Sequence, residues 1–267
     1  MKKILWFLCA LLLACATAAA EASPAVEVRD DLGKYFRGYA GTMVIYDQPG
    51  DRYIVYNEPQ SRKRLSPCST FKIYNSLIGL ETGVLDAADE NTLMKWDGTH
   101  RSIDGWNRDH TLASATSNSV VWYFQNLAAR IGETRMQERL DAIGYGNRDI
   151  SGGLTTFWLR SSLRISAVEQ VDLLTRLYSG QLPFSAGNVA IVKRNITLAE
   201  NNGTVFMGKT GSGFEDGRWL HGWFVGGVEK QGGRYIFAVN IEAPDGATGV
   251  AARKIAEAVL KDLAILP

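Results

Sequence analysis

An apolar run near the start of the chain is rich in residues that favour a β-strand. Residues 41–47 read Gly-Thr-Met-Val-Ile-Tyr-Asp, and residues 53–56 resume an extended, aromatic and β-branched pattern. Between them, residues 48–51 read Gln-Pro-Gly-Asp, which is turn chemistry. The pattern therefore predicts a β-hairpin. Towards the other end of the chain it predicts three more strands, over 204–207, 219–228 and 235–241.

The middle of the chain follows a helical period instead. Helices are predicted over residues 71–80, 120–131, 134–143, 166–178 and 186–198. A long amphipathic helix is predicted over 247–265, and Ser166 forms a capping box with Glu169. Residues 86–116 show neither pattern and are rich in Asp, Gly and Trp, which is typical of a long surface loop or of part of a site.

This order of elements predicts an α/β fold of the α+β type. One antiparallel sheet is built from both chain ends and flanked by helices, with an inserted helical domain. We divide the chain into a signal peptide at 1–20 and one domain at 21–267. The sheet part covers about 24–65 and 204–267, and the helical part covers about 66–203. A site between the two parts would lie in a cleft.

The first residues form a secretory signal. Lys2 and Lys3 provide the charged start, residues 4–16 are apolar, and Ala18-Ala19-Ala20 is a cleavage site. The apolar run is too short to span a membrane, although an uncleaved N-terminal anchor is the alternative. We therefore expect a soluble protein outside the cytoplasm, without a membrane partner once the signal is removed.

Composition narrows the possible partners. Loss of the signal removes Cys9 and Cys15, which leaves Cys68 and no internal disulfide. The remaining chain of about 245 residues is long enough to be stabilised by its core alone. Without Lys2 and Lys3, 27 basic residues face 28 acidic ones. A net charge near −1 gives no reason to expect nucleic acid or an anionic membrane as a partner.

The first candidate for chemistry is Ser69-x-x-Lys72, and no other Ser in the sequence has a Lys three residues later. At a helix start, positions i and i+3 lie on one face, which would place a base beside a weak nucleophile. On this motif alone, a helix start with an exposed Lys is the better explanation.

Other short motifs are also ambiguous. Lys209-Thr210-Gly211 directly follows a predicted strand and suits a carboxylate or an oxyanion, or is a strand end with a solvated Lys. Ser119 opens a predicted helix as an N-cap, or passes a proton if it faces Ser69. Tyr145-Gly146-Asn147 is a turn or part of a site, and Trp158 is a core residue or a ligand contact.

Several chemistries are excluded by spacing. The three histidines, at 100, 110 and 221, do not form metal-ligand spacings. No G-x-S-x-G elbow surrounds Ser69, and phosphate-binding and dinucleotide-binding glycine patterns are absent.

The ordered set of motifs is more specific than any member. It resembles the class D serine β-lactamases (oxacillinases) of the penicillin-recognising serine enzyme superfamily. The resemblance covers about 30–265. Further matching stretches are Trp96–Gly98, Trp106–Asp109, Ile150–Gly153 and Leu163–Val168.

The resemblance implies hydrolysis of β-lactam antibiotics. Ser69 would be the nucleophile that forms the acyl-enzyme, and Lys72 the general base, used as an N-carboxylated lysine formed with CO2. Burial favours a neutral amine, which can add CO2 to give a carbamate that behaves like a Glu base. Trp158 would hold the carbamate by its indole N–H, and Val121 and Leu159 would form an apolar lid.

The resemblance also implies how substrate is held. Ser119 and Lys209 would be the proton-relay and electrostatic pair, and the backbone N–H groups of Ser69 and Ser212 the oxyanion hole. The expected substrate-binding residues are Val121, Leu159, Thr210, Gly211, Ser212 and Arg253. No cofactor is implied except CO2 or bicarbonate, and no metal. We expect a β-lactam as the small-molecule partner, no nucleic acid, and a periplasmic monomer or homodimer.

One departure from the family pattern and two alternatives stay open. The family usually reads Trp-x-x-Gly where this chain has Trp158-Leu159-Arg160-Ser161. If that Gly has a positive φ, Ser161 would be strained and the loop beneath Lys72 displaced. The alternatives are a non-hydrolytic, sensor-like β-lactam-binding domain and a penicillin-binding peptidase, because Tyr145-x-Asn147 also fits the latter.

Overall fold

A seven-stranded sheet organises the computed structural model, which describes residues 24–267. Its order is β1-β3-β2-β7-β6-β5-β4. The strands are β1 (Ala25–Val28), β2 (Ala40–Asp47), β3 (Arg52–Tyr56), β4 (Thr197–Asn201), β5 (Thr204–Glu215), β6 (Arg218–Lys230) and β7 (Gly233–Glu242). Segments from both chain ends thus lie side by side, since β2 pairs with β7. The predicted fold class is confirmed, while the proposed signal peptide lies outside the described residues.

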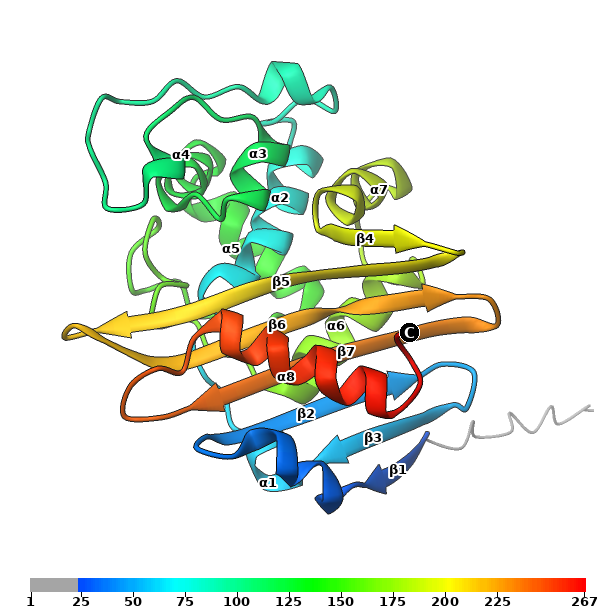
Figure 1. The fold of residues 1–267 in the computed structure, drawn as a ribbon. Coiled ribbons are helices and arrows are strands. Elements are labelled where there is room, and N and C mark those ends of the chain that lie inside the picture. Colours follow the sequence, from blue (N-terminus) through cyan, green and yellow to red (C-terminus); the bar gives the residue numbers. More distant parts are fainter. Residues whose placement is uncertain (1–23) are drawn as a thin grey trace, which may run out of the picture.

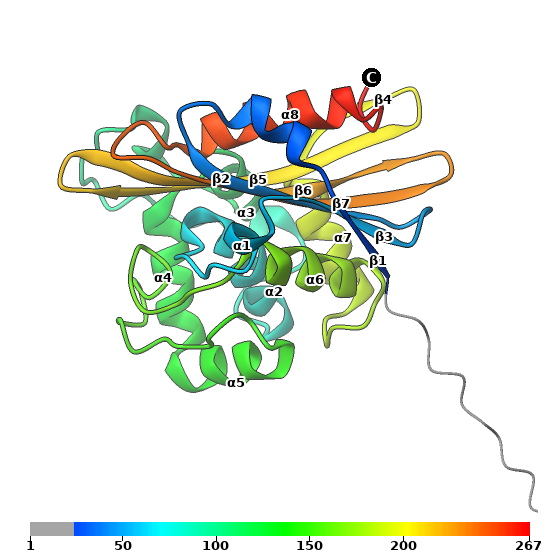
Figure 2. The same ribbon diagram turned by 90° about the horizontal axis from the view of Figure 1, so that it is seen from below.

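Helices form a layer on each face of the sheet (Figures 1 and 2). The helix α8 (Gly249–Asp262) covers one face, and the remaining helices pack on or beyond the other. These are α1 (Glu58–Ser61), α2 (Lys72–Glu81), α3 (Leu112–Ser117), α4 (Val121–Ile131), α5 (Glu133–Ile143), α6 (Ala167–Tyr178) and α7 (Ala186–Asn195). The predicted helices are confirmed, including the capping box of Ser166 at the start of α6.

Each layer encloses its own apolar core. Residues of α8 pack with one face of the sheet, for example Val259 with Phe237 in the same buried cluster. The larger cluster joins the other face to α2, α4 and α6, and includes Phe71, Phe124 and Trp158. The second core fixes the helical part to the sheet, and the start of α2 lies within it.

Four predictions about the elements were wrong. The sheet is not purely antiparallel, because β1 pairs with β3 in parallel. The last helix of the middle region ends at Asn195, and β4 follows it as an unpredicted edge strand. The unpredicted α3 interrupts the irregular stretch. The strand β5 continues eight residues beyond Met207 to Glu215. Its glycines lower strand propensity, but pairing with β6 along its whole length outweighs this.

Candidate active site

The candidate site forms where the start of α2 meets the middle of β5. Residues Cys68–Phe71 make a 3₁₀ turn that continues into α2 at Lys72, so Ser69 and Lys72 share one face. A side chain at Gly211 would lie 2.8 Å from the Pro67 carbonyl oxygen. Only glycine therefore lets β5 approach the turn that carries Ser69.

Four predicted side chains meet there. Lys72 Nζ lies 2.6 Å from Ser69 Oγ and 3.2 Å from Ser119 Oγ. Lys209 Nζ lies 3.0 Å from Ser119 Oγ. Ser119 thus joins the two lysines. This group of Ser69, Lys72, Ser119 and Lys209, which we call the lysine cluster, has a nucleophile at one end and a continuous path for a proton.

Burial changes the charge of both lysines. Lys72 has no exposed surface, and desolvation, with repulsion from Lys209, lowers its pKa well below the ordinary value. Desolvation lowers the pKa of Lys209 to about 8. No carboxylate of the described residues contributes to either shift. Burial therefore favours the neutral amine of Lys72, the form able to accept a proton or to add CO2.

The surroundings of Lys72 include an unused donor. Trp158 is fully buried against Phe71 at 5.6 Å between ring centroids, and its indole Nε1 has no hydrogen-bond partner among the described residues. A buried N–H without an acceptor is costly. A carboxylated Lys72 would supply an acceptor within the same buried cluster, so these residues fit the carbamate.

One apolar neighbour of Lys72 was not predicted. The ring of Phe124 lies 5.5 Å from Lys72 Nζ, whereas the predicted lid residues Val121 and Leu159 are half-buried. Phe124 stands three positions after Val121 in α4, so the two share a helix face. That spacing was the signal in the sequence that could have found it.

Two local predictions about these residues were wrong. Lys209-Thr210-Gly211 lies in the middle of β5, not after a strand end. Ser119 is not the N-cap of α4, since Val120 holds that position and Ser119 has a φ of 53°. The left-handed turn between α3 and α4 directs the hydroxyl towards the lysines instead.

The concern about Ser161 was also misplaced. Ser161 does not have a positive φ, and Arg160 takes the left-handed conformation with a φ of 52°. The Ser161 hydroxyl donates to the Gly152 carbonyl at 3.3 Å, and a Cβ at Gly152 would lie 1.9 Å from that hydroxyl. Gly152 thus provides the room that Ser161 requires.

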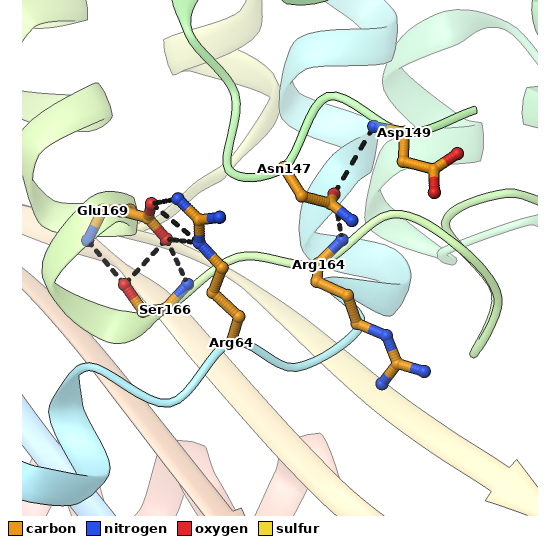
Figure 3. Close-up of polar contacts among 6 residues, drawn as sticks. All are labelled: Arg64, Asn147, Asp149, Arg164, Ser166 and Glu169. Carbon is orange, nitrogen blue, oxygen red and sulfur yellow. Dashed lines mark hydrogen bonds and ion pairs between the residues drawn. The ribbon is translucent and has the colours of Figure 1, made fainter. Parts of the chain in front are cut away.

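Tyr145-Gly146-Asn147 has a structural role. The Tyr145 ring is fully buried and packs edge-on against Phe71 at 5.4 Å. Figure 3 shows Asn147 Oδ1 accepting from the backbone N–H of Arg164, at 2.8 Å. Asn147 Nδ2 also donates to the Ser162 carbonyl at 2.8 Å. These contacts favour the turn interpretation over a catalytic tyrosine.

The proposed substrate-carboxylate residues share a small cavity. Lys209, Thr210 and Arg253 line a space of about 140 Å³ together with Ser117. Arg253 is partly exposed, is paired with Glu257 at 2.7 Å, and lies over the Phe224 ring. A separate hollow of about 870 Å³, lined by residues such as Lys63, Arg164 and Glu242, contains none of the lysine cluster.

Residues 24–267 contain neither a candidate metal site nor a helix able to span a membrane. No group of three or more His, Cys, Asp or Glu side chains could hold a metal ion. Within the same residues, every helix is too short or too polar to span a membrane.

Residues 41–262 match the family model of the penicillin-binding protein transpeptidase domain. The chain is 41% identical to the probable β-lactamase YbxI of Bacillus subtilis over 86% of this chain and 84% of that protein. It is 41% identical to the solved structure of the class D β-lactamase BAT-2, with a TM-score of 0.83, covering 88% of this chain and 96% of the other.

A receptor domain is also similar. The chain is 38% identical to the regulatory protein BlaR1 of Bacillus licheniformis over 89% of its own length, but this match spans only 39% of the regulator. The solved C-terminal domain of that penicillin receptor superposes with a TM-score of 0.88 at 37% identity, covering 92% of this chain and 99% of the domain. The comparisons therefore include both enzymes and a receptor module.

Proposed function

The chain belongs to the class D β-lactamases, and from this premise we propose that it hydrolyses β-lactams through a Ser69 acyl-enzyme, with carboxylated Lys72 as general base. The observation that carries this proposal is the 2.6 Å approach of Lys72 Nζ to Ser69 Oγ inside a buried, carboxylate-free pocket. A charged lysine would be unable to accept the serine proton, and burial disfavours that charge.

In acylation, Ser69 Oγ attacks the lactam carbonyl carbon while its proton passes to the base at position 72. The carbon–nitrogen bond of the ring then breaks, and the leaving nitrogen takes a proton through Ser119, which lies between both lysines. The backbone N–H groups of Ser69 and Ser212 stabilise the oxyanion. Loss of one such donor typically raises the barrier by about 3 kcal/mol.

Three features support carboxylation of Lys72. Burial favours the neutral amine of Lys72, the Trp158 indole N–H has no acceptor among the described residues, and the Phe124 ring lies 5.5 Å from the Lys72 nitrogen. When present, the carbamate supplies a carboxylate-like base for both acylation and deacylation. Water then cleaves the Ser69 ester, which releases a ring-opened acid and returns the proton to Ser69.

Substrate binding depends on β5. Lys209, Thr210 and Arg253 line one cavity, which suits the carboxylate that β-lactams carry beside the ring. Val121 and Leu159 contact the apolar side of the bound molecule, and Gly211 and Ser212 place backbone groups along it. Because Arg253 already pairs with Glu257, substrate has to share or displace that pairing.

The second candidate is a sensor-like domain that acylates without turnover, favoured by the likeness to the BlaR receptor domain. Hydrolysis is the better-supported function because the match to YbxI spans most of both proteins, whereas the match to BlaR1 spans less than half of the regulator. We further propose that the protein is exported to the periplasm after cleavage of residues 1–20, as a monomer or homodimer.

Nitrocefin turnover by the purified protein tests the function. We expect steady-state hydrolysis that continues far beyond one equivalent, and bicarbonate should restore activity lost at low pH because protonated Lys72 cannot hold CO2. A single stoichiometric burst, with a stable acyl adduct by mass spectrometry, would establish the receptor function instead. Continued turnover that does not depend on bicarbonate would support hydrolysis but contradict the proposed carbamate.

A further inference from the structure

Ser66 is a buried residue whose hydroxyl closes the turn that carries Trp158. It is 1% exposed and lies three residues before the nucleophile. Its Oγ donates to the Trp158 carbonyl at 2.8 Å and accepts from the backbone N–H of Arg160 at 2.9 Å. One side chain thus satisfies the polar groups on both sides of Leu159.

Ser66 itself is held from several directions. Its carbonyl accepts from the indole Nε1 of Trp223 at 2.9 Å, and His221 Nε2 lies 3.1 Å from the same oxygen. The preceding residue, Leu65, exchanges backbone hydrogen bonds with Ile165. These contacts tie the residues just before Ser69 to β6 and to the far end of the Trp158 loop.

The position of Ser66 is reinforced two residues earlier, at Arg64. Arg64 makes a bidentate contact with Glu169, which also accepts from the Ser166 backbone N–H (Figure 3). Since the backbone at Ser66 is pinned on both sides, a lost hydroxyl could not be replaced by a shift of the chain.

The Trp158 turn requires such a clamp. Arg160 has a left-handed φ of 52°, which is unfavourable for a residue with a Cβ. The Trp158 indole has no hydrogen bond of its own to fix it. Its position therefore depends on ring packing with Phe71 and Phe157 and on its backbone, which Ser66 holds.

We propose that Ser66 is a positioning residue, which holds the Trp158 indole N–H where it meets carboxylated Lys72. The inference rests on the proposed carbamate. The Ser66 hydroxyl bonds to the backbone of the Trp158 turn and lies 3.9 Å from Cys68 Sγ, so it acts on Lys72 only through other residues. Ser66 sets how tightly Lys72 retains CO2. The acylation step depends on Ser66 only through the carboxylated Lys72.

The test is a titration of Lys72 carboxylation with ¹³C-bicarbonate, read by ¹³C NMR in purified protein without substrate. In Ser66→Ala we expect the half-saturating bicarbonate concentration to rise about tenfold, the scale of one lost hydrogen bond. Trp158→Phe should raise it as well, because the donor itself is removed. Ser66→Thr keeps the hydroxyl and should return the value to within about threefold of wild type.

The matched control is Ser61→Ala. Ser61 is also fully buried, and its Oγ donates to the Glu58 carbonyl at 2.6 Å within α1, which packs against β2 and β3. It should lower the melting temperature without changing the bicarbonate titration. If Ser66→Ala does not fold, Ser66→Cys, kept reduced, retains the volume with a weaker donor and should give an intermediate shift.

Two results would overturn the proposal. A wild-type titration in Ser66→Ala would show that Ser66 is only structural, and equal shifts in Ser66→Ala and Ser66→Thr would assign the effect to packing. A wild-type protein that turns over nitrocefin but gives no carbamate signal would instead refute the carboxylated base itself. The carbamate signal of the wild-type protein therefore distinguishes failure of the Ser66 proposal from failure of the carboxylated base.

Discussion

Two polar clusters flank the Trp158 loop, and they differ in how completely their groups are paired. In the lysine cluster, two buried lysine side chains share one serine hydroxyl without a carboxylate partner, and burial lowers the pKa of each lysine. The second cluster, which we call the staple cluster, consists of Arg64, Asn147, Arg164, Ser166 and Glu169 (Figure 3).

In the staple cluster, Asn147, Ser166 and Glu169 are hydrogen-bonded within the protein. Burial raises the pKa of Glu169, but hydrogen bonds from Arg64 and Ser166 outweigh burial and lower it. Asn147 uses both its oxygen and its nitrogen on backbone groups. A side chain whose hydrogen bonds are all used inside the protein has none left for substrate. Buried lysines without a carboxylate partner, rather than polarity as such, therefore mark the candidate chemistry in this chain.

The largest effect on catalysis is expected from Lys72→Ala. Removal of the general base should lower the deacylation rate by about 10²–10⁴-fold. Ser69 remains, so acyl-enzyme should accumulate on slow exposure to a penicillin. Stopped-flow nitrocefin kinetics and intact-protein mass spectrometry measure the two effects.

The control for this change is Lys254→Ala, which removes an exposed lysine from α8. Its deacylation rate should equal that of wild type. Rapid turnover by Lys72→Ala would contradict the assignment of the base to this residue.

The next largest effect is expected in the pH dependence of kcat/KM, which reports the charge of Lys209. Desolvation lowers the pKa of Lys209 to about 8, so the ammonium loses its proton as pH rises through that value. The positive charge that attracts the substrate carboxylate is therefore present below about pH 8 and lost above it. We expect kcat/KM to fall by up to about tenfold per pH unit on the alkaline side.

Lys209→Arg identifies the group responsible. A guanidinium stays charged in proteins, so the alkaline limb should move above about pH 10, after correction for spontaneous hydrolysis of the lactam. An alkaline limb that stays near 8 in the variant would show that another group, such as Lys72, produces it.

The lysine cluster was the more predictable of the two from sequence. Ser69, Lys72, Ser119 and Lys209 occur in motifs whose order along the chain matched a family, and the structure places them within hydrogen-bonding reach. What they do in this chain stays a prediction.

Features that depend on packing were not found in advance. The role of Ser66 arises from contacts with residues 92 and 94 positions away, which no local pattern encodes. Similarly, the positive φ falls on Arg160 because the turn is set by tertiary hydrogen bonds, while the family pattern drew attention to Ser161. The predicted strand ended too early at Met207, because the glycines that follow have low strand propensity. Pairing with β6, which the local sequence does not show, extends the strand to Glu215.

The smallest catalytic effect, and the sharpest test of the contrast, is expected from Asn147→Ala. This change leaves the backbone N–H of Arg164 and the Ser162 carbonyl without their side-chain partners. Urea denaturation should show a loss of about 1–3 kcal/mol in the free energy of unfolding. At a temperature where the variant is folded, kcat for nitrocefin should stay within about threefold of wild type, because no atom of Asn147 is free for substrate.

A fall in kcat of two orders of magnitude with unchanged stability would place Asn147 in the catalytic machinery, as expected for a penicillin-binding peptidase. Asn188→Ala, which removes one hydrogen bond to Glu81 at the C-terminal end of α2, provides the stability reference.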